Sequence, residues 1–171
     1  MANDDYPWDP PVAGTEAEAL VGALDRLRTT FRWKADDLDA AGLQTRIPSS
    51  PLTLGSLLKH LSRAEDEIFT VKLSGAPRSA PWDTAPWDAD PDWDFTSAPG
   101  DSLSDLVALY QAACERSRAV TAAHQLDDIG VRTDRGEFSL RWVLVHLLEE
   151  TARHLGHLDI LVEQLEGRTG E

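Results

Sequence analysis

The sequence has little of what an exported or membrane-bound protein needs. Cys114 is the single cysteine among 171 residues, so no internal disulfide can form, which agrees with a reducing compartment. The first residues lack a basic segment followed by an apolar one, so no signal peptide is expected. No apolar run approaches the roughly 20 residues of a transmembrane helix. We therefore expect a cytoplasmic protein that does not bind membranes.

Positive charge is also scarce. The 16 Lys and Arg residues stand against 30 Asp and Glu residues, which gives a net charge of −14. This charge repels phosphate backbones, so nucleic acid is not expected as a partner. The sequence also lacks a glycine-rich phosphate loop, a Gly-x-Ser-x-Gly motif and a Cys-x-x-Cys pair, and we expect Cys114 to be buried and unreactive. A small-molecule substrate is the expected partner, and a homodimer is allowed.

Apolar residues recur every three or four positions in four segments, which predicts four helices, each opened by a Ser or Thr cap. The predicted helices run from Thr15 to Gly42, from Thr53 to Gly75, from Ser102 to His124 and from Ser139 to Gly167. Two short connections and one long one between such helices predict an all-α four-helix bundle. Residues 1–13, with three prolines and several acids, are expected to form an extended arm before a single domain over 14–171.

The long connection between the second and third predicted helices is the unusual segment. Residues 74–101 contain five prolines, which forbid a regular helix, and three tryptophans that alternate with aspartates. A long loop with large side chains in a compact domain is usually a lid, a binding loop or a packed crossover. Its extended length allows the second and third helices to run parallel, and hence an up-down-down-up order.

A shorter connection, residues 126–138, carries turn-forming sequences. Asp127 and Asp128 come shortly before Gly130, and Asp134 comes shortly before Gly136. This turn chemistry predicts a short hairpin before the last helix begins.

Two polar residues of the last predicted helix share its apolar face. Four residues turn a helix about 40° past a full circle, so Glu150 and His154 lie on one face with Val143. An unpaired carboxylate there would be costly, and a metal ion bound by the pair would compensate it. His60, on an apolar face of the second helix, is a third candidate ligand. Two nitrogens and one carboxylate oxygen suit Zn²⁺, Ni²⁺, Fe²⁺ or Mn²⁺.

The same spacing allows a simpler arrangement without a metal. Glu150 and His154 could form a buried hydrogen-bonded pair, with His60 an unrelated histidine of the core. His157, near the same face, could be a fourth ligand, a substrate contact or a residue that orients a ligand. The spacing leaves these alternatives open.

Three stretches together resemble the DinB/YfiT-like metalloenzyme superfamily. They are Leu57-Leu-Lys-His60-Leu, the Trp/Asp-rich loop, and the string Glu-Glu-Thr-Ala-Arg-His-Leu-Gly-His-Leu-Asp-Ile-Leu over 149–161. The resemblance covers about 14–167, and the closest branch is the group named "mini-circle". It implies a four-helix bundle of up-down-down-up topology with a metal site of three residues.

Carried over residue by residue, the resemblance places the metal on His60, Glu150 and His154. Many relatives have His at the position of Glu150. The His-Glu-His version is similar to the mycothiol-dependent maleylpyruvate isomerase branch, whose metal activates a low-molecular-weight thiol. His157 falls where many relatives carry Gln, and we expect it to be catalytic. The implied cofactors are a divalent metal, Zn²⁺ first, and a thiol such as mycothiol.

We therefore expect a metal-dependent enzyme of the thiol S-transferase or isomerase type. The metal would lower the pKa of a thiol, and His157 or a metal-bound water would move the proton. The tryptophan loop, residues 82–95, would close over the open metal positions. One alternative is a metal-dependent hydrolase, in which the metal activates water. Another is a non-catalytic stress or interaction bundle whose metal is structural, with four protein ligands.

Overall fold

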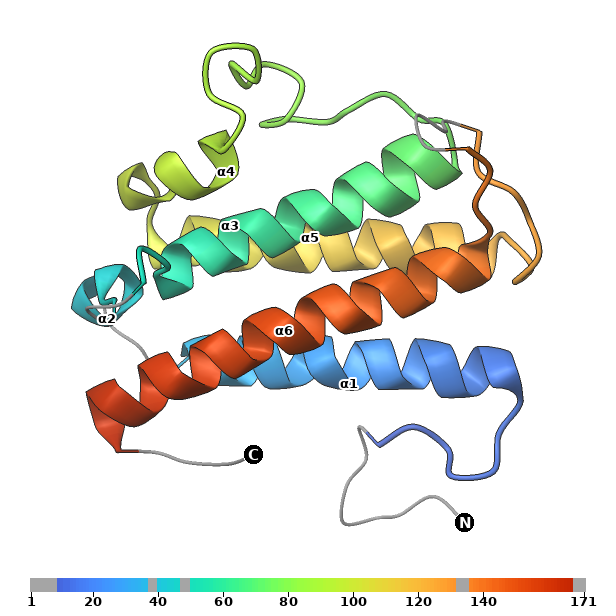
Figure 1. The fold of residues 1–171 in the computed structure, drawn as a ribbon, viewed down its shortest axis with the longest axis horizontal. Coiled ribbons are helices and arrows are strands. Elements are labelled where there is room, and N and C mark those ends of the chain that lie inside the picture. Colours follow the sequence, from blue (N-terminus) through green and yellow to red (C-terminus); the bar gives the residue numbers. More distant parts are fainter. Residues whose placement is uncertain (1–8, 37–39, 47–49, 132–135, 168–171) are drawn as a thin grey trace.

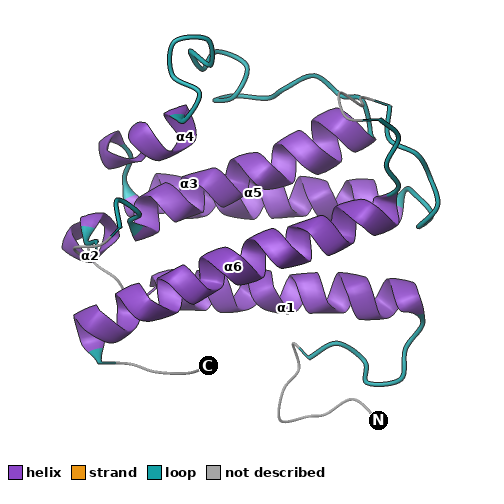
Figure 2. Ribbon diagram, viewed as in Figure 1, coloured by secondary structure: helices purple, strands orange, loops and turns teal. Residues whose placement is uncertain are grey.

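The computed structural model describes residues 9–36, 40–46, 50–131 and 136–167. Helices make up its regular structure, which confirms the all-α class (Figure 1, Figure 2). The long helices of this part are α1 (Glu16–Asp36), α3 (Leu54–Glu65) with its π-helical continuation η1 (Asp66–Leu73), α5 (Leu103–Ala122) and α6 (Leu140–Glu166). The short ones are α2 (Ala40–Gln44), α4 (Trp93–Thr96) and the 3₁₀ turn η2 (Ala98–Gly100). No described helix has both the length and the apolar character to cross a bilayer.

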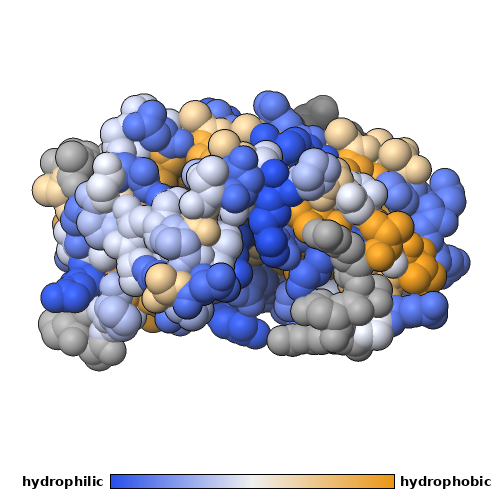
Figure 3. Space-filling view, turned by 90° about the horizontal axis from the view of Figure 1, so that it is seen from above, coloured by the Kyte–Doolittle hydropathy of each residue, from blue (hydrophilic) through white to orange (hydrophobic). Residues whose placement is uncertain are grey.

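The long helices pack in two pairs, α1 beside α6 and α3 beside α5. In Figure 1, α3 and α5 run in the same direction, whereas α1 and α6 run in the opposite direction. The connection over residues 74–101 makes this possible, because it carries the chain back along the top of the bundle to the start of α5. Seen from above (Figure 3), the surface is mainly hydrophilic, and hydrophobic residues show in separate patches.

Side-chain caps set the helix starts where the sequence predicts them. The Thr53 hydroxyl accepts from the Ser56 N–H at 3.1 Å, and the Ser56 hydroxyl accepts from the Thr53 N–H at 3.0 Å, a reciprocal capping box. Ser102 and Ser139 each accept from the N–H three residues further on, at 3.2 and 3.3 Å. α6 is followed by Gly167 at φ 68°, a left-handed conformation that glycine adopts without strain.

Two helices differ from the prediction. α1 ends at Asp36, and Gly42 lies inside the short helix α2, so Gly42 is not the residue that terminates the first helix. The second predicted helix keeps its length but changes from α to π at Asp66. At its end the N–H of Ser74 donates to the carbonyl of Phe69, five residues back, at 3.0 Å.

The predicted hairpin is reduced to one antiparallel bridge, between Ile129 and Ser139. The N–H of Gly130 donates to the carbonyl of Phe138 at 2.9 Å, and no strand forms in the described part of this connection. Asp134 lies outside the described residues.

The end of the proposed N-terminal arm packs against α1. Residues 9–13 form no helix, and Asp9 pairs with Arg26 at 2.9 Å. A Cβ on Gly22 would lie 2.8 Å from Cβ of Pro10, so the arm approaches α1 at a position where no side chain fits.

Two apolar clusters fill the bundle, and a buried ion pair lies between them. One cluster includes Phe31, Leu57, Leu61 and Leu158, and the other includes Leu24, Phe69, Val143 and Leu147. Arg28 of α1 donates through Nε and Nη2 to the two carboxylate oxygens of Glu65 of α3, at 2.7 and 2.5 Å. These side chains are 4% and 1% exposed, and a third guanidinium nitrogen of Arg28 donates to Asp25 at 2.9 Å.

The next residue of the chain is a second buried acid. Asp66 accepts from Nε and Nη2 of Arg116 at 2.7 and 2.8 Å and from the indole N–H of Trp82 at 2.9 Å. Glu65 and Asp66 thus bind arginines of two different helices, α1 and α5, at the point where the π-helix begins. Such π-helical segments are rare and frequently mark functional sites.

The central ion pair gives the first prediction. Arg28→Met leaves Glu65 buried without its partner, so the free energy of unfolding should fall by about 3–5 kcal/mol. Arg78→Met is the matched control, because Arg78 makes the same two-bond contact with Glu67 at the surface, where a pair contributes about 1 kcal/mol or less. Urea unfolding measures the free energy of unfolding of both variants. Equal losses in the two would contradict the role of the buried pair, and Arg28→Met/Glu65→Leu should recover most of the loss.

Candidate metal centre

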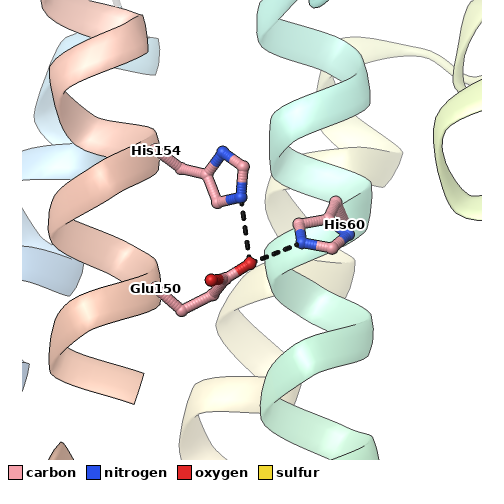
Figure 4. A group of neighbouring side chains, drawn as sticks. All are labelled: His60, Glu150 and His154. Carbon is pink, nitrogen blue, oxygen red and sulfur yellow. Dashed lines mark hydrogen bonds and ion pairs between the residues drawn. The ribbon is translucent and has the colours of Figure 1, made fainter. Parts of the chain in front are cut away.

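The three predicted ligands come together between α3 and α6 (Figure 4). Oε1 of Glu150 lies 3.1 Å from Nε2 of His60 and 3.1 Å from Nε2 of His154. One donor atom from each residue lies within 4.8 Å of the other two. His154 is buried, and the side chains of His60 and Glu150 are both 18% exposed, so the group is open to solvent on one side.

Helix geometry explains why these side chains meet. Glu150 and His154 are one turn apart on the face of α6 that also carries the buried Leu147 and Leu158. His60 lies between buried leucines of α3 and reaches across to α6. The carboxylate therefore takes the position between the two imidazoles without disturbing the core.

The second oxygen of Glu150 also has a partner. Oε2 accepts from Nη1 of Arg153 at 3.0 Å, which turns Oε1 toward the two imidazole rings. The Arg153 side chain is 62% exposed, so it holds the carboxylate from the solvent side.

Asp94, which the sequence analysis did not single out, orients His60. Its Oδ2 lies 2.8 Å from Nδ1 of His60, and its side chain is fully buried. A carboxylate on this ring nitrogen fixes the proton there and leaves Nε2 free to bind a cation. The ring of Phe95 stacks on the His60 ring with centroids 4.3 Å apart. Asp94 is one of several aspartates in a proline-rich loop, and no local pattern distinguishes it from the others.

The tryptophans of the connection hold Asp94 in place indirectly. Their rings contact one another at centroid distances of 5.8 to 6.4 Å. Arg63 of α3 lies over the Trp87 ring at 4.3 Å and donates to Asp94 at 3.3 Å, and Lys59 lies over the Trp93 ring at 4.3 Å. The loop thus reaches the site through Asp94 and Phe95, while the tryptophan rings pack on cations of α3.

His157 lies behind His154. Nδ1 of His157 is 3.4 Å from Nδ1 of His154, whereas Nε2 of His154 faces Glu150. His157 therefore contacts the side of the ring away from the predicted metal position. In the described residues no fourth donor joins the group of three, so the donor set is not that of a closed four-ligand zinc site.

The pKa shifts of Glu150 and His154 favour the forms that bind a cation, whereas the pKa shift of His60 favours its protonated form. Burial lowers the pKa of His60, but hydrogen bonds to Asp94 and Glu150 outweigh it and the pKa is raised. Burial and repulsion from His60 lower the pKa of His154. Burial raises the pKa of Glu150, but the hydrogen bond from His60 and the attraction of His154 outweigh it, so the pKa is lowered. Near neutral pH Glu150 is ionised and His154 is neutral, the forms in which they bind metals.

The other two histidines and the cysteine lie outside this group. His146 stacks on Trp142 with ring centroids 4.8 Å apart, and Nδ1 of His124 lies 2.7 Å from the carbonyl of Val120. Cys114 is buried, and burial together with the Glu65 carboxylate raises its pKa to about 12, so it is unreactive as expected.

The all-α bundle fits the fold of the DinB/YfiT-like class. The family model described as "Mycothiol-S-transferase" matches residues 19–167, and the chain belongs to this family. A search of curated proteins found no match.

Metal binding to this group can be tested by stability. If the folded chain alone binds Zn²⁺, a concentration about 100 times Kd should add about 2.7 kcal/mol to the free energy of unfolding and raise Tm. His154→Ala should lose this gain and stoichiometric uptake of metal, whereas His146→Ala, the control, should keep both. Metal analysis after purification without a nickel column, with thermal melts before and after chelation, gives the readout. Equal melting temperatures with and without metal would favour a buried Glu–His pair.

The role of Asp94 gives a separate prediction. Asp94→Asn keeps the size of the side chain but removes the negative charge beside Nδ1 of His60. Metal affinity should therefore fall about 10- to 100-fold. Asp92→Asn is the control, since Asp92 is a neighbouring loop aspartate outside this contact. Competition with a chromogenic chelator measures both affinities. An unchanged affinity in Asp94→Asn would show that Asp94 does not orient the ligand.

Proposed function

We propose that this protein is a metal-dependent S-transferase that joins a low-molecular-weight thiol, such as mycothiol, to an electrophilic small molecule. The proposal combines membership of the family with the geometry of His60, Glu150 and His154. We further propose that it acts in the cytoplasm, where thiols are kept reduced.

The observation that carries the proposal is how each candidate ligand is oriented. Asp94 holds the outer nitrogen of His60, Arg153 holds the outer oxygen of Glu150, and His157 lies against the outer nitrogen of His154. Partners of this kind are typical of metal sites, because they fix the direction of the atom that binds. Two imidazoles and one carboxylate suit Zn²⁺ first, with Ni²⁺, Fe²⁺ and Mn²⁺ also suitable, and leave room for an outside ligand.

A divalent cation held by these residues would lower the pKa of a thiol sulfur beside it. In the transfer the S–H bond breaks and the sulfur forms a bond to the electrophilic carbon. We propose that His157 takes the thiol proton through an intervening water, since its ring contacts His154 on the side away from the metal position, and that the proton returns to the leaving group or to the carbon next to the new bond. Phe95, stacked on His60, limits water on that side of the site.

Conjugation kinetics test this function. The assay uses an electrophile that becomes fluorescent on thiol addition. We expect the metal-loaded protein to add mycothiol to this electrophile faster than it adds glutathione. His157→Asn should lower kcat about 100-fold, the usual size of a proton-transfer contribution, without loss of metal. His146→Asn is the control histidine and should keep full activity.

The alternatives give different results in the same assay. If the metal-loaded protein does not accelerate thiol addition, the S-transferase proposal is wrong. Thiol-independent ester hydrolysis that disappears in His154→Ala would favour a metal-dependent hydrolase. A His157→Asn variant with unchanged kcat would remove His157 from the mechanism and leave the metal site unaffected.

A further inference from the structure

A large cleft lies at the end of the bundle where α1 begins, α5 ends and α6 begins, on the right in Figure 1. Its volume is about 770 Å³, which falls within the usual range of small-molecule sites. Its apolar lining includes Val21, Leu126, Leu140 and Leu144. Small side chains on two of its walls, Ala17 of α1 and Ala122 of α5, leave the space open.

This cleft is separate from the candidate metal centre. None of the three candidate ligands lines it, nor does Asp94 or His157. Leu144, on its wall, lies six residues before Glu150 and so points about 120° away around α6. A molecule in the cleft would not touch the metal.

Most charges that line the cleft are already paired. All three guanidinium nitrogens of Arg28 donate to the carboxylates of Glu65 and Asp25. Arg141 binds Glu16 of α1 and Asp127, so these carboxylates are neutralised. The carboxylate of Glu18, which also lines the cleft, accepts from the N–H and the hydroxyl of Thr15.

Arg118 differs from these residues. Its Nε donates to Asp25 at 2.9 Å, and within the described chain its two terminal amino groups make no hydrogen bond. The side chain is 45% exposed and lines the cleft from the α5 side. His124 lines the same wall, and its Nδ1 lies against the Val120 carbonyl, which leaves Nε2 without a partner among the described residues.

We propose that this cleft binds a small organic anion, a carboxylate on an apolar body. The carboxylate pairs with the terminal amino groups of Arg118, and the body covers the leucines. A guanidinium binds a carboxylate through two parallel hydrogen bonds. The half-exposed contact of Arg118 with Asp25 contributes little, so Arg118 can turn to the ligand at low cost. Burial of the apolar body against these leucines then makes the free energy of binding more favourable.

Three probes with the same phenylbutyl body separate charge from apolar contact: phenylbutyrate, phenylbutanol and phenylbutylamine. NMR titration of the full-length protein detects even weak binding and locates it. We expect phenylbutyrate to bind about tenfold more tightly than the alcohol, since one charge-assisted contact is worth that much. Shifts should cluster at the end of α5 and the start of α6. An amine that binds as tightly as the carboxylate, or no binding at all, would overturn the proposal.

Paired variants locate the site. Ala122→Trp fills the cleft and should abolish binding, whereas Ala123→Trp, at the adjacent exposed position outside the cleft, should not. Arg118→Gln should weaken phenylbutyrate binding about tenfold, while Arg78→Gln, at a distant exposed pair, should leave it unchanged. Binding should persist in His154→Ala. If that variant loses binding while Ala122→Trp keeps it, the carboxylate binds at the metal centre and this proposal is wrong.

Discussion

The bidentate ion pair between Arg28 and Glu65 constrains the rest of the bundle. Both charges are almost fully buried, and displacing α3 along α1 by one turn would leave Glu65 without its partner and Arg28 with Asp25 alone, at a cost of several kcal/mol. The pair therefore fixes the register of α3 against α1. His60 lies five residues before Glu65 on the same helix, so this register also sets the level at which His60 meets Glu150 of α6.

Three parts of the chain contribute to the candidate metal centre in different ways. α6 supplies Glu150 and His154 through its own repeat, and their relation needs no other segment. α3 supplies His60 at the level that the Arg28–Glu65 pair sets. The connection over residues 74–101 supplies Asp94, which gives His60 its direction. The same segment that allows α3 and α5 to run parallel thus completes the site.

The sequence was sufficient to place Glu150 and His154 on one face, because an i, i+4 pair on an apolar stripe is a local property of one helix. His60 lies on another helix, and the family resemblance joined it to the pair. The sequence was not sufficient to predict the role of Asp94, since only the docking of the connection on Arg63 distinguishes this aspartate from its neighbours. The ion pair of Asp66, where the π-helix begins, was hidden for a similar reason, because its partner Arg116 is 50 residues away. The helix starts were predictable from their caps, whereas the end of α1 was not.

The position of Asp94 outside the long helices has a consequence for partial unfolding. Proteins open in separate units, and a connection that packs on one face of a bundle can detach while the helices stay folded. Detachment would remove the carboxylate from His60 but leave Glu150 and His154 together on α6. The three candidate ligands would then hold a cation more weakly, because His60 on α3 would lack the carboxylate that orients it. Release of metal could then follow the opening rate of the connection, independent of global unfolding.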